Sequence, residues 1–104
     1  MKTILITGAS GGIGKETTKL FAQKGGWNVV ATMRRPENET ELTQIPNVTV
    51  LQLDVTNDES VKNAIAETLE KFGTIDVLFN NAGYGVIGAL ESANYEDYYR
   101  QFRQ

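Results

Sequence analysis

Three glycines near the start of the chain have the spacing of a phosphate-binding turn. Gly8, Gly12 and Gly14 follow one another as G-x-x-x-G-x-G, directly after a short apolar run at positions 4–6. The first would let the chain turn with positive φ, the second leaves no Cβ between backbone and ligand, and the third lets a helix pack closely. Unpaired N–H groups at the start of that helix, together with its dipole, would bind a diphosphate. Glycines also punctuate ordinary turns, so the motif has weight only between a strand and a helix.

A second anion site is indicated by two adjacent arginines. Arg34 and Arg35 follow residues 27–33, where many dinucleotide-binding units place an Asp or Glu against a ribose 2′-hydroxyl. Guanidinium groups would instead form charge-assisted bonds with a 2′-phosphate, worth roughly 1.5 to 3 kcal/mol each. The pair therefore favours NADP over NAD as a ligand. Either arginine, Arg35 more readily than Arg34, could alternatively be a solvated loop residue.

Two further polar turns follow later apolar runs. Asp54 comes after residues 48–53, and its carboxylate could accept a hydrogen bond from the exocyclic amine of an adenine. It could equally be an ordinary residue at the start of a helix, beside Thr56. Residues 80–83, Asn-Asn-Ala-Gly, would let a ribose approach their small side chains while an asparagine bridges neighbouring loops. In isolation this segment would be a simple turn.

Four strands must position these turns. They are predicted over residues 3–7, 27–33, 48–53 and 75–79. Right-handed crossovers place them in the order 3-2-1-4, with helices on both faces. The expected fold class is α/β, a Rossmann-like parallel sheet that forms half of a doubly wound fold. Strand four would lie at a sheet edge, but its sequence is too apolar for a solvated edge, so something should cover it.

Two helices connect the strands. The apolar face of the first is predicted from residues at helical spacing, namely Ile13, Thr17, Leu20 and Phe21. Glycines at 25 and 26 would end it. The second has apolar residues at helical spacing from 61 to 72, a capping box of Thr56 and Glu59, and Gly73 after its end. A short helix is expected within residues 37–43, a glycine-bearing loop over 84–93, and a last helix over 95–104.

Composition narrows the chemistry. The chain has no cysteine and no histidine, which excludes thiol catalysis, histidine bases and nearly every zinc or copper site. A net charge of −3 argues against a broad nucleic-acid-binding surface, because such a surface needs clustered positive charge. The apolar runs are far shorter than the roughly 20 residues of a membrane span, and the first residues show no signal-peptide pattern. We expect one cytoplasmic dinucleotide-binding domain over residues 1–104, truncated in its last helix.

Three motifs together resemble the short-chain dehydrogenase/reductase family, over essentially all 104 residues. They are T-G-x-x-x-G-x-G at 7–14, L-D-V at 53–55 and N-N-A-G at 80–83. The resemblance implies that Ser10 and residues 12–14 meet the phosphates, Arg34 the 2′-phosphate, residues 54–55 the adenine and residues 80–83 the ribose side. With the two arginines, the expected NADP site consists of Gly8, Ser10, Gly12, Ile13, Gly14, Arg34, Arg35, Asp54, Val55, Asn80, Ala82 and Gly83.

The family's catalytic motif is absent from this sequence. The resemblance implies hydride transfer between a nicotinamide and a carbonyl or alcohol, with a Tyr-x-x-x-Lys pair as the acid and base. All six lysines precede the first tyrosine, Tyr84, so no such pair exists here. Tyr99 and Arg103 have the same spacing but fall on the expected last helix. The sequence therefore indicates the NADP(H)-binding half of a short-chain oxidoreductase, which alone would bind cofactor without catalysis.

A second hypothesis comes from another class of protein. The chain would be a non-catalytic assembly module that pairs with a copy of itself or with a partner chain through strand four and residues 95–104. The expected partners are therefore the dinucleotide and either a second copy of the chain or a missing C-terminal half. A flavodoxin-like regulator is excluded because no acidic cluster follows the first strand.

Overall fold

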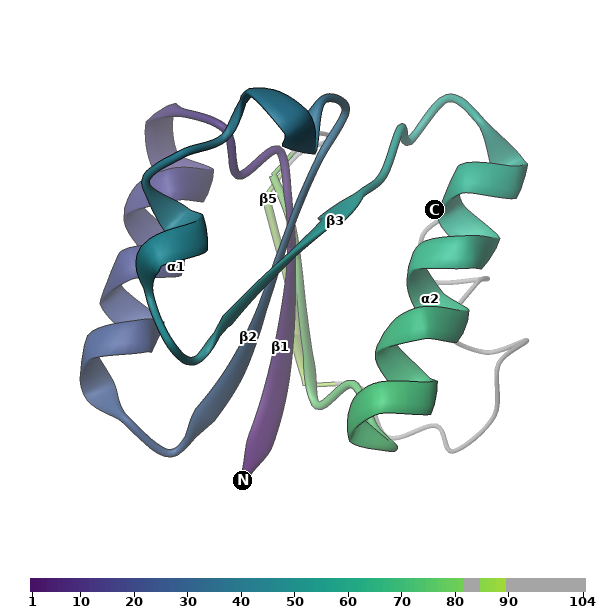
Figure 1. Ribbon diagram of the computed structural model, residues 1–104. Helices are drawn as coiled ribbons and strands as arrows, with labels where there is room; N and C mark the ends of the chain where they lie inside the picture. Colours follow the sequence, from purple (N-terminus) through teal and green to yellow (C-terminus); the bar gives the residue numbers. More distant parts are fainter. Residues whose placement is uncertain (82–84, 90–104) are drawn as a thin grey trace.

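The computed structural model describes residues 1–81 and 85–89. Its two helices lie on opposite faces of a sheet, α1 (Gly12–Lys24) on one and α2 (Asp58–Phe72) on the other (Figure 1). The strands are β1 (Lys2–Thr7), β2 (Trp27–Met33), β3 (Val48–Gln52), β4 (Val77–Asn80) and β5 (Gly85–Ala89). In place of one short helix after β2, two single 3₁₀ turns form, η1 (Pro36–Asn38) and η2 (Leu42–Gln44).

The sheet has the order β3-β2-β1-β4-β5. β1 pairs in parallel with β2 and with β4, so that Leu5 lies between Val30 and Leu78. The predicted parallel order 3-2-1-4 is therefore confirmed. Because these strands are parallel, the turns after β1, β2, β3 and β4 all lie at the carboxyl-terminal end of the sheet. Ligands bind at this end in open α/β folds.

Beyond β4 the structure corrects two expectations. The segment predicted as a loop contains β5, which pairs antiparallel with β4. Strand four is therefore not an exposed edge, because β5 takes up the hydrogen-bonding groups on that side. The prediction that something covers strand four is met within the chain, and this edge is not open for pairing with a partner. The helix expected over residues 95–104 lies outside the described residues.

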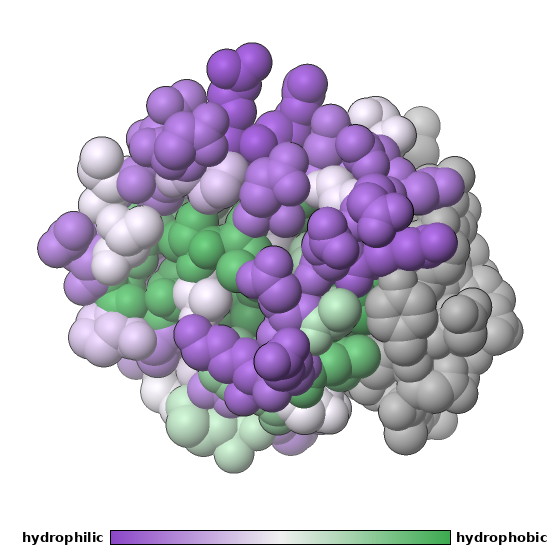
Figure 2. All heavy atoms as spheres, turned by 45° about the vertical axis from the view of Figure 1, so that its right-hand side comes forward, coloured by the Kyte–Doolittle hydropathy of each residue, from purple (hydrophilic) through white to green (hydrophobic). Residues whose placement is uncertain are grey.

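The sheet separates two apolar clusters. Ile4 and Ile6 point to the α1 face, where Leu42 from η2 joins them, while Leu5 points to the α2 face and packs on Ile65. This alternation is the two-residue period of a strand, and both of its faces are covered because helices flank a parallel sheet. On the face shown in Figure 2, hydrophilic side chains cover most of the described surface, and hydrophobic ones show mainly in a hollow between them.

The apolar face predicted for α1 is partly wrong. Ile13 is 68% exposed and Leu20 is 57% exposed, whereas Gly14 and Thr18 are buried. Gly14 has no side chain, and its backbone lies close to the Gly8 carbonyl, so Gly14 and Thr18 are the buried positions of α1 rather than its larger residues. The hydroxyl of Thr18 is satisfied there because it donates to the Gly14 carbonyl at 2.8 Å.

α2 follows the prediction along its length but not at its start. Its buried side chains include Val61 and Ile65, and Gly73 ends it with a φ of 82°. The N-cap is Asn57 rather than Thr56, because the Asn57 Oδ1 accepts from two first-turn amides. Neither helix in the described part of the chain is long and apolar enough to cross a bilayer.

Candidate functional site

The turn between β1 and α1, residues 8–14, is here called the glycine turn. Gly8 and Gly12 have φ values of 63° and 56°, a conformation that residues with a Cβ adopt only with strain. The amide of Ala9 donates to the Thr32 carbonyl at 3.0 Å, which fastens the turn to β2. Among the described residues no side chain caps the start of α1, and its first turn has no acidic residue. The first-turn amides of a helix have no acceptor within the helix, so they suit the binding of an anion.

Gly14 has a different role from the other glycines of the turn. A Cβ built on Gly14 would lie 2.2 Å from the Gly8 carbonyl oxygen and 3.0 Å from the Asn81 Nδ2. Asn81 also donates to that carbonyl at 3.3 Å, so it bridges the end of β4 and the glycine turn as predicted for an asparagine of this segment. A Cβ on Gly11 or Gly12 would meet no described atom within 4 Å. Gly14 therefore shapes the turn, while Gly11 and Gly12 leave space in front of it.

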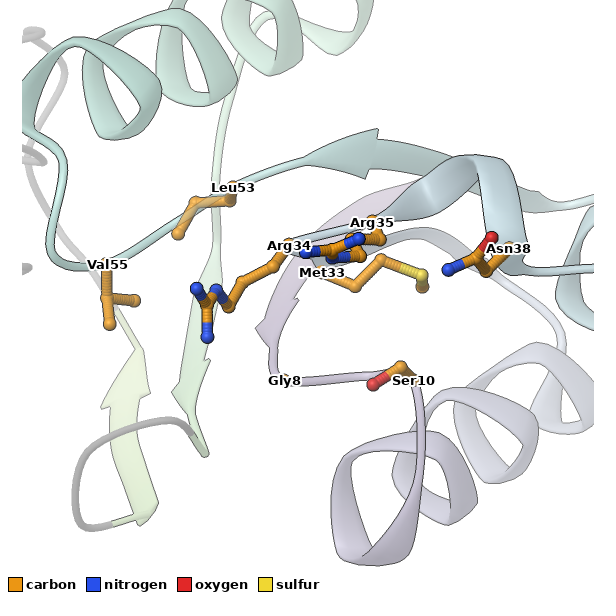
Figure 3. Close-up of a pocket in the computed structure, with 8 residues that line it drawn as sticks. All are labelled: Gly8, Ser10, Met33, Arg34, Arg35, Asn38, Leu53 and Val55. Carbon is orange, nitrogen blue, oxygen red and sulfur yellow. The ribbon is translucent and has the colours of Figure 1, made fainter.

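A cavity of about 420 Å³ opens beside the glycine turn at the carboxyl ends of the strands. It is lined by Gly8, Ser10, Met33, Arg34, Arg35, Asn38, Leu53 and Val55. Figure 3 shows these residues at the carboxyl ends of three strands, in the turn after β1, at the end of β2 and beyond it, and after β3. Arg34 reaches toward the side of Leu53 and Val55, and Asn38 lies on the opposite side, with Ser10 below them (Figure 3). Five of the twelve predicted residues therefore line one cavity.

Arg34 is largely free to meet a ligand. Its side chain is 77% exposed, and its Nε lies 3.9 Å from the Asp54 Oδ2, the outer limit for an ion pair. An exposed pair at this distance contributes little to stability, so a phosphate can replace it. Arg35 is likewise exposed and lines the same cavity.

Asp54 does not line the cavity, although Val55 beside it does. Its Oδ1 accepts from the Thr56 hydroxyl at 2.6 Å and from the Thr56 amide at 3.0 Å. These two bonds, with a smaller contribution from the Arg34 guanidinium, hold the pKa of Asp54 below its ordinary value. The carboxylate thus shapes the start of the β3–α2 connection and holds Arg34 loosely.

Asn80 ends β4 as a half-buried link between strands. Its Oδ1 accepts from the Thr7 hydroxyl at 2.9 Å, which joins the carboxyl ends of β4 and β1. Ala82 and Gly83, the other predicted residues of this turn, lie outside the described residues. Gly12 and Ile13 do not line this cavity. They line a second hollow, along α1 with Lys15 and Leu20.

Three residues of the cavity were not predicted from the sequence. Met33 and Leu53 are nearly fully buried and close the floor of the cavity, and their position at strand ends was the available signal. Asn38 gives no such signal, because it reaches the cavity only through the η1 turn. Ser60 was also missed. Its hydroxyl accepts from the Asp54 amide at 2.8 Å and donates to Gln52 at 3.0 Å, which holds the loop carrying Val55.

The site fits the adenosine diphosphate part of a dinucleotide. The free amides and open space at the glycine turn suit a diphosphate, and the apolar floor beside them suits a base. Two guanidinium groups at the cavity rim suit a second anion. Among the described residues, no group of three or more His, Cys, Asp or Glu side chains is arranged to hold a metal ion.

Comparison with known proteins agrees with this geometry. The sequence model described as short chain dehydrogenase matches residues 2–103. An uncharacterized oxidoreductase of Schizosaccharomyces pombe is 40% identical over 95% of this chain and 33% of its own length. A 3-ketodihydrosphingosine reductase of Bacteroides thetaiotaomicron is 44% identical over 90% of this chain and 33% of its own length.

A solved structure shares both the fold and the sequence pattern. The menthone neomenthol reductase of Mentha piperita superposes with a TM-score of 0.70 and 33% identity, over 79% of this chain and 31% of that protein. The chain thus spans about a third of the length of the relatives that it matches.

Proposed function

The chain belongs to the short-chain dehydrogenase/reductase family, and on that premise we propose that it binds NADP(H) in preference to NAD(H). Members of this family use nicotinamide dinucleotides, and a bound nicotinamide supplies the hydride that passes to or from a carbonyl or alcohol carbon. We propose this reaction class for the whole oxidoreductase to which the matched third corresponds.

One observation carries the proposed preference. Two arginines and no carboxylate line the described part of the cavity beside the glycine turn. A ribose 2′-hydroxyl would find no acidic acceptor among those lining residues, whereas a 2′-phosphate would find Arg34 and Arg35 within the same cavity. Asp54, the nearest acidic group to Arg34, is engaged with Thr56.

The roles that we propose follow the geometry of the site. The amides of residues 10–13 would donate to the diphosphate, because they surround the open start of α1. Gly8 and Gly14 would keep the turn in shape. Val55 and Leu53 would contact the adenine, with the Asp54 carboxylate beside its amine. For Asn80 we propose the ribose side, together with Ala82 and Gly83.

We also propose that these 104 residues bind cofactor without turning it over. No Tyr-x-x-x-Lys pair occurs in the sequence, so no tyrosine has a lysine at the family's spacing to lower its pKa. The assembly-module hypothesis loses its main argument, because β5 occupies the edge of β4.

The test is calorimetric titration of the chain with four ligands: NADP, NAD, 2′,5′-ADP and 5′-AMP. We expect the two 2′-phosphorylated ligands to bind more tightly than their counterparts. Arg34→Ala should reduce this preference at least about tenfold, the loss of one charge-assisted bond. Lys2→Ala is the matched control, because it removes a positive charge at the opposite end of β1. Equal affinity of the native chain for NADP and NAD would overturn the proposal.

A further inference from the structure

The connection after β2 carries three of the cavity residues on an exposed segment. This segment, residues 34–42, is here called the arm, and it holds Arg34, Arg35 and Asn38. It leaves the sheet at Met33 and returns to the core at Leu42, which is fully buried against the α1 face. Between these two anchors, the η1 turn closes with the Asn38 amide donating to the Arg35 carbonyl at 3.1 Å.

Glu39 is the buried charged side chain of the arm. Its side chain is only 4% exposed, in a segment whose neighbours face solvent. Its Oε2 accepts from the Leu42 amide at 2.8 Å and from the Glu41 amide at 3.0 Å. The carboxylate therefore closes the arm onto its own anchor and caps the η2 turn.

The same carboxylate oxygen connects the arm to α1. The Lys15 ammonium lies 3.4 Å from the Glu39 Oε2 and 3.2 Å from the Glu41 Oε1, and Lys19 pairs with Glu41 one helical turn farther along. Burial alone would raise the pKa of Glu39, but the Leu42 amide and Lys15 together bring that pKa below its ordinary value. Glu39 is therefore ionised at neutral pH, and its charge is compensated.

These contacts join the two anion sites of the cavity. Lys15 belongs to the first turns of α1, directly after the glycine turn, and its amide donates to the Gly11 carbonyl at 3.3 Å. The arginines belong to the arm. The distance between the diphosphate position and the 2′-phosphate position is thus set by where Glu39 and Lys15 hold the arm against the helix.

We propose that Glu39 is a positioning residue for the 2′-phosphate, because it fixes the arm that carries Arg34, Arg35 and Asn38 against the start of α1. This inference rests on the NADP preference proposed above and adds to it a residue that touches no ligand. The preference for a 2′-phosphorylated ligand then depends on the negative charge of Glu39, although the 2′-phosphate is itself negatively charged.

The direction in which phosphate affinity changes when the Glu39 charge is removed distinguishes two explanations. If Glu39 acted only through its field, removing its charge would strengthen the binding of a phosphate. If it positions the arm, removing its charge weakens the binding. Glu39→Gln is the informative change, because the amide oxygen can still accept from the two arm amides while the charge facing Lys15 is lost.

The measurement is the affinity of the full chain for 2′,5′-ADP divided by its affinity for 5′-AMP. We expect Glu39→Gln to lower this ratio about tenfold, the effect of one weakened charge-assisted bond, with 5′-AMP affinity unchanged. Glu37→Gln is the matched control. It removes the same charge from the same arm, and Glu37 has no hydrogen bond or ion pair with any described residue. This control should leave the ratio unchanged or raise it slightly.

Each outcome decides the matter. A ratio in Glu39→Gln equal to that of the control overturns the inference, and so does a parallel loss of 5′-AMP affinity in a folded variant. If Glu39→Gln does not fold, Lys15→Met replaces it, with Lys24→Met as the control of equal charge, because Lys24 lies in the last turn of α1 and forms no ion pair with the arm among the described residues. Equal ratios in these two variants overturn the inference. A native chain with a ratio near one overturns the NADP preference itself, which is a distinguishable result.

Discussion

The glycine turn and the arm bring charges to the same cavity by opposite means. The glycine turn uses backbone alone, with two positive φ angles, a close approach of Gly14 to the Gly8 carbonyl and no ionisable side chain. The arm uses side chains, with a buried carboxylate and two lysines of α1 holding an exposed segment. The two regions lie on either side of one 420 Å³ cavity.

This difference makes the sequence of the glycine turn fixed and that of the arm adjustable. Backbone geometry at the glycine turn leaves few alternatives to glycine, so a diphosphate site of this kind can vary little without loss of the fold. Exposed ion pairs contribute little to the stability of the fold, so the exposed residues of the arm, such as Arg34 and Glu41, can change at small cost. We infer that cofactor choice is placed in the adjustable region because the fold does not depend on it.

The largest expected effect is at Gly14. Gly14→Ala would place a Cβ 2.2 Å from the Gly8 carbonyl oxygen, and both backbone segments are held by β1 and α1. Overpacking of this kind typically costs 1 to 3 kcal/mol, and we expect a loss of about 3 kcal/mol in the free energy of unfolding. Urea unfolding followed by circular dichroism measures it.

Gly11→Ala is the matched control for that change. Gly11 has an extended backbone with a φ of −168°, and a Cβ there would meet no described atom within 4 Å. We expect its free energy of unfolding to stay within about 0.5 kcal/mol of the native value. Equal losses in the two variants would show that the approach of Gly14 to Gly8 is not what holds the turn.

The fold and the glycine turn could be predicted from the sequence because both follow local or topological rules. Strand and helix periods, right-handed crossovers and the backbone freedom of glycine are local or topological rules, and the order 3-2-1-4 follows from them. The burial of α1 could not be predicted from hydrophobic spacing, because its buried positions are the small residues Gly14 and Thr18, while Ile13 and Leu20 are exposed. Residues 85–89 form a strand that pairs antiparallel with β4 as its neighbour in the chain, and the glycine-bearing sequence there was interpreted as a loop.

The arm was only half predictable. Arg34 and Arg35 could be found because they directly follow a strand, where the ligand edge of the sheet lies. Asn38 and Glu39 could not, because their roles depend on how the η1 turn folds back on α1. No spacing rule links Glu39 to Lys15, which is 24 residues earlier in the chain.

An intermediate effect is expected at Gly12. A residue with a Cβ at a φ of 56° is strained by about 1 to 2 kcal/mol, but the Cβ itself would point into open space. Gly12→Ala should therefore lower the free energy of unfolding by about 1 kcal/mol and leave the chain folded. Because that space is the proposed diphosphate position, we expect affinity for both 5′-AMP and 2′,5′-ADP to fall together. Calorimetry that shows unchanged affinity for both would place the diphosphate elsewhere.

The smallest effect is local and appears on acidification. The glycine turn has no titratable side chain, whereas the arm depends on Glu39 and Glu41, whose pKa values lie below the ordinary range. For Glu41 the cause is Lys19 first and then Lys15. A carboxyl whose pKa is lowered by folding stabilises the fold above its unfolded pKa, about 4.3, and loses that contribution as the pH falls through its folded pKa.

The arm should therefore loosen in acid while the glycine turn keeps its structure. The Leu42 amide, which donates to Glu39, reports on the arm, and the Ala9 amide, which donates to the Thr32 carbonyl, reports on the turn. Hydrogen exchange, corrected for the intrinsic effect of pH, should show protection at Leu42 falling between pH 5 and about pH 3 while protection at Ala9 persists. Loss at both amides together would mean that the arm and the turn open as one unit. The division into an adjustable arm and a fixed glycine turn would then be wrong, because protonation of the carboxylates of the arm would also open the glycine turn.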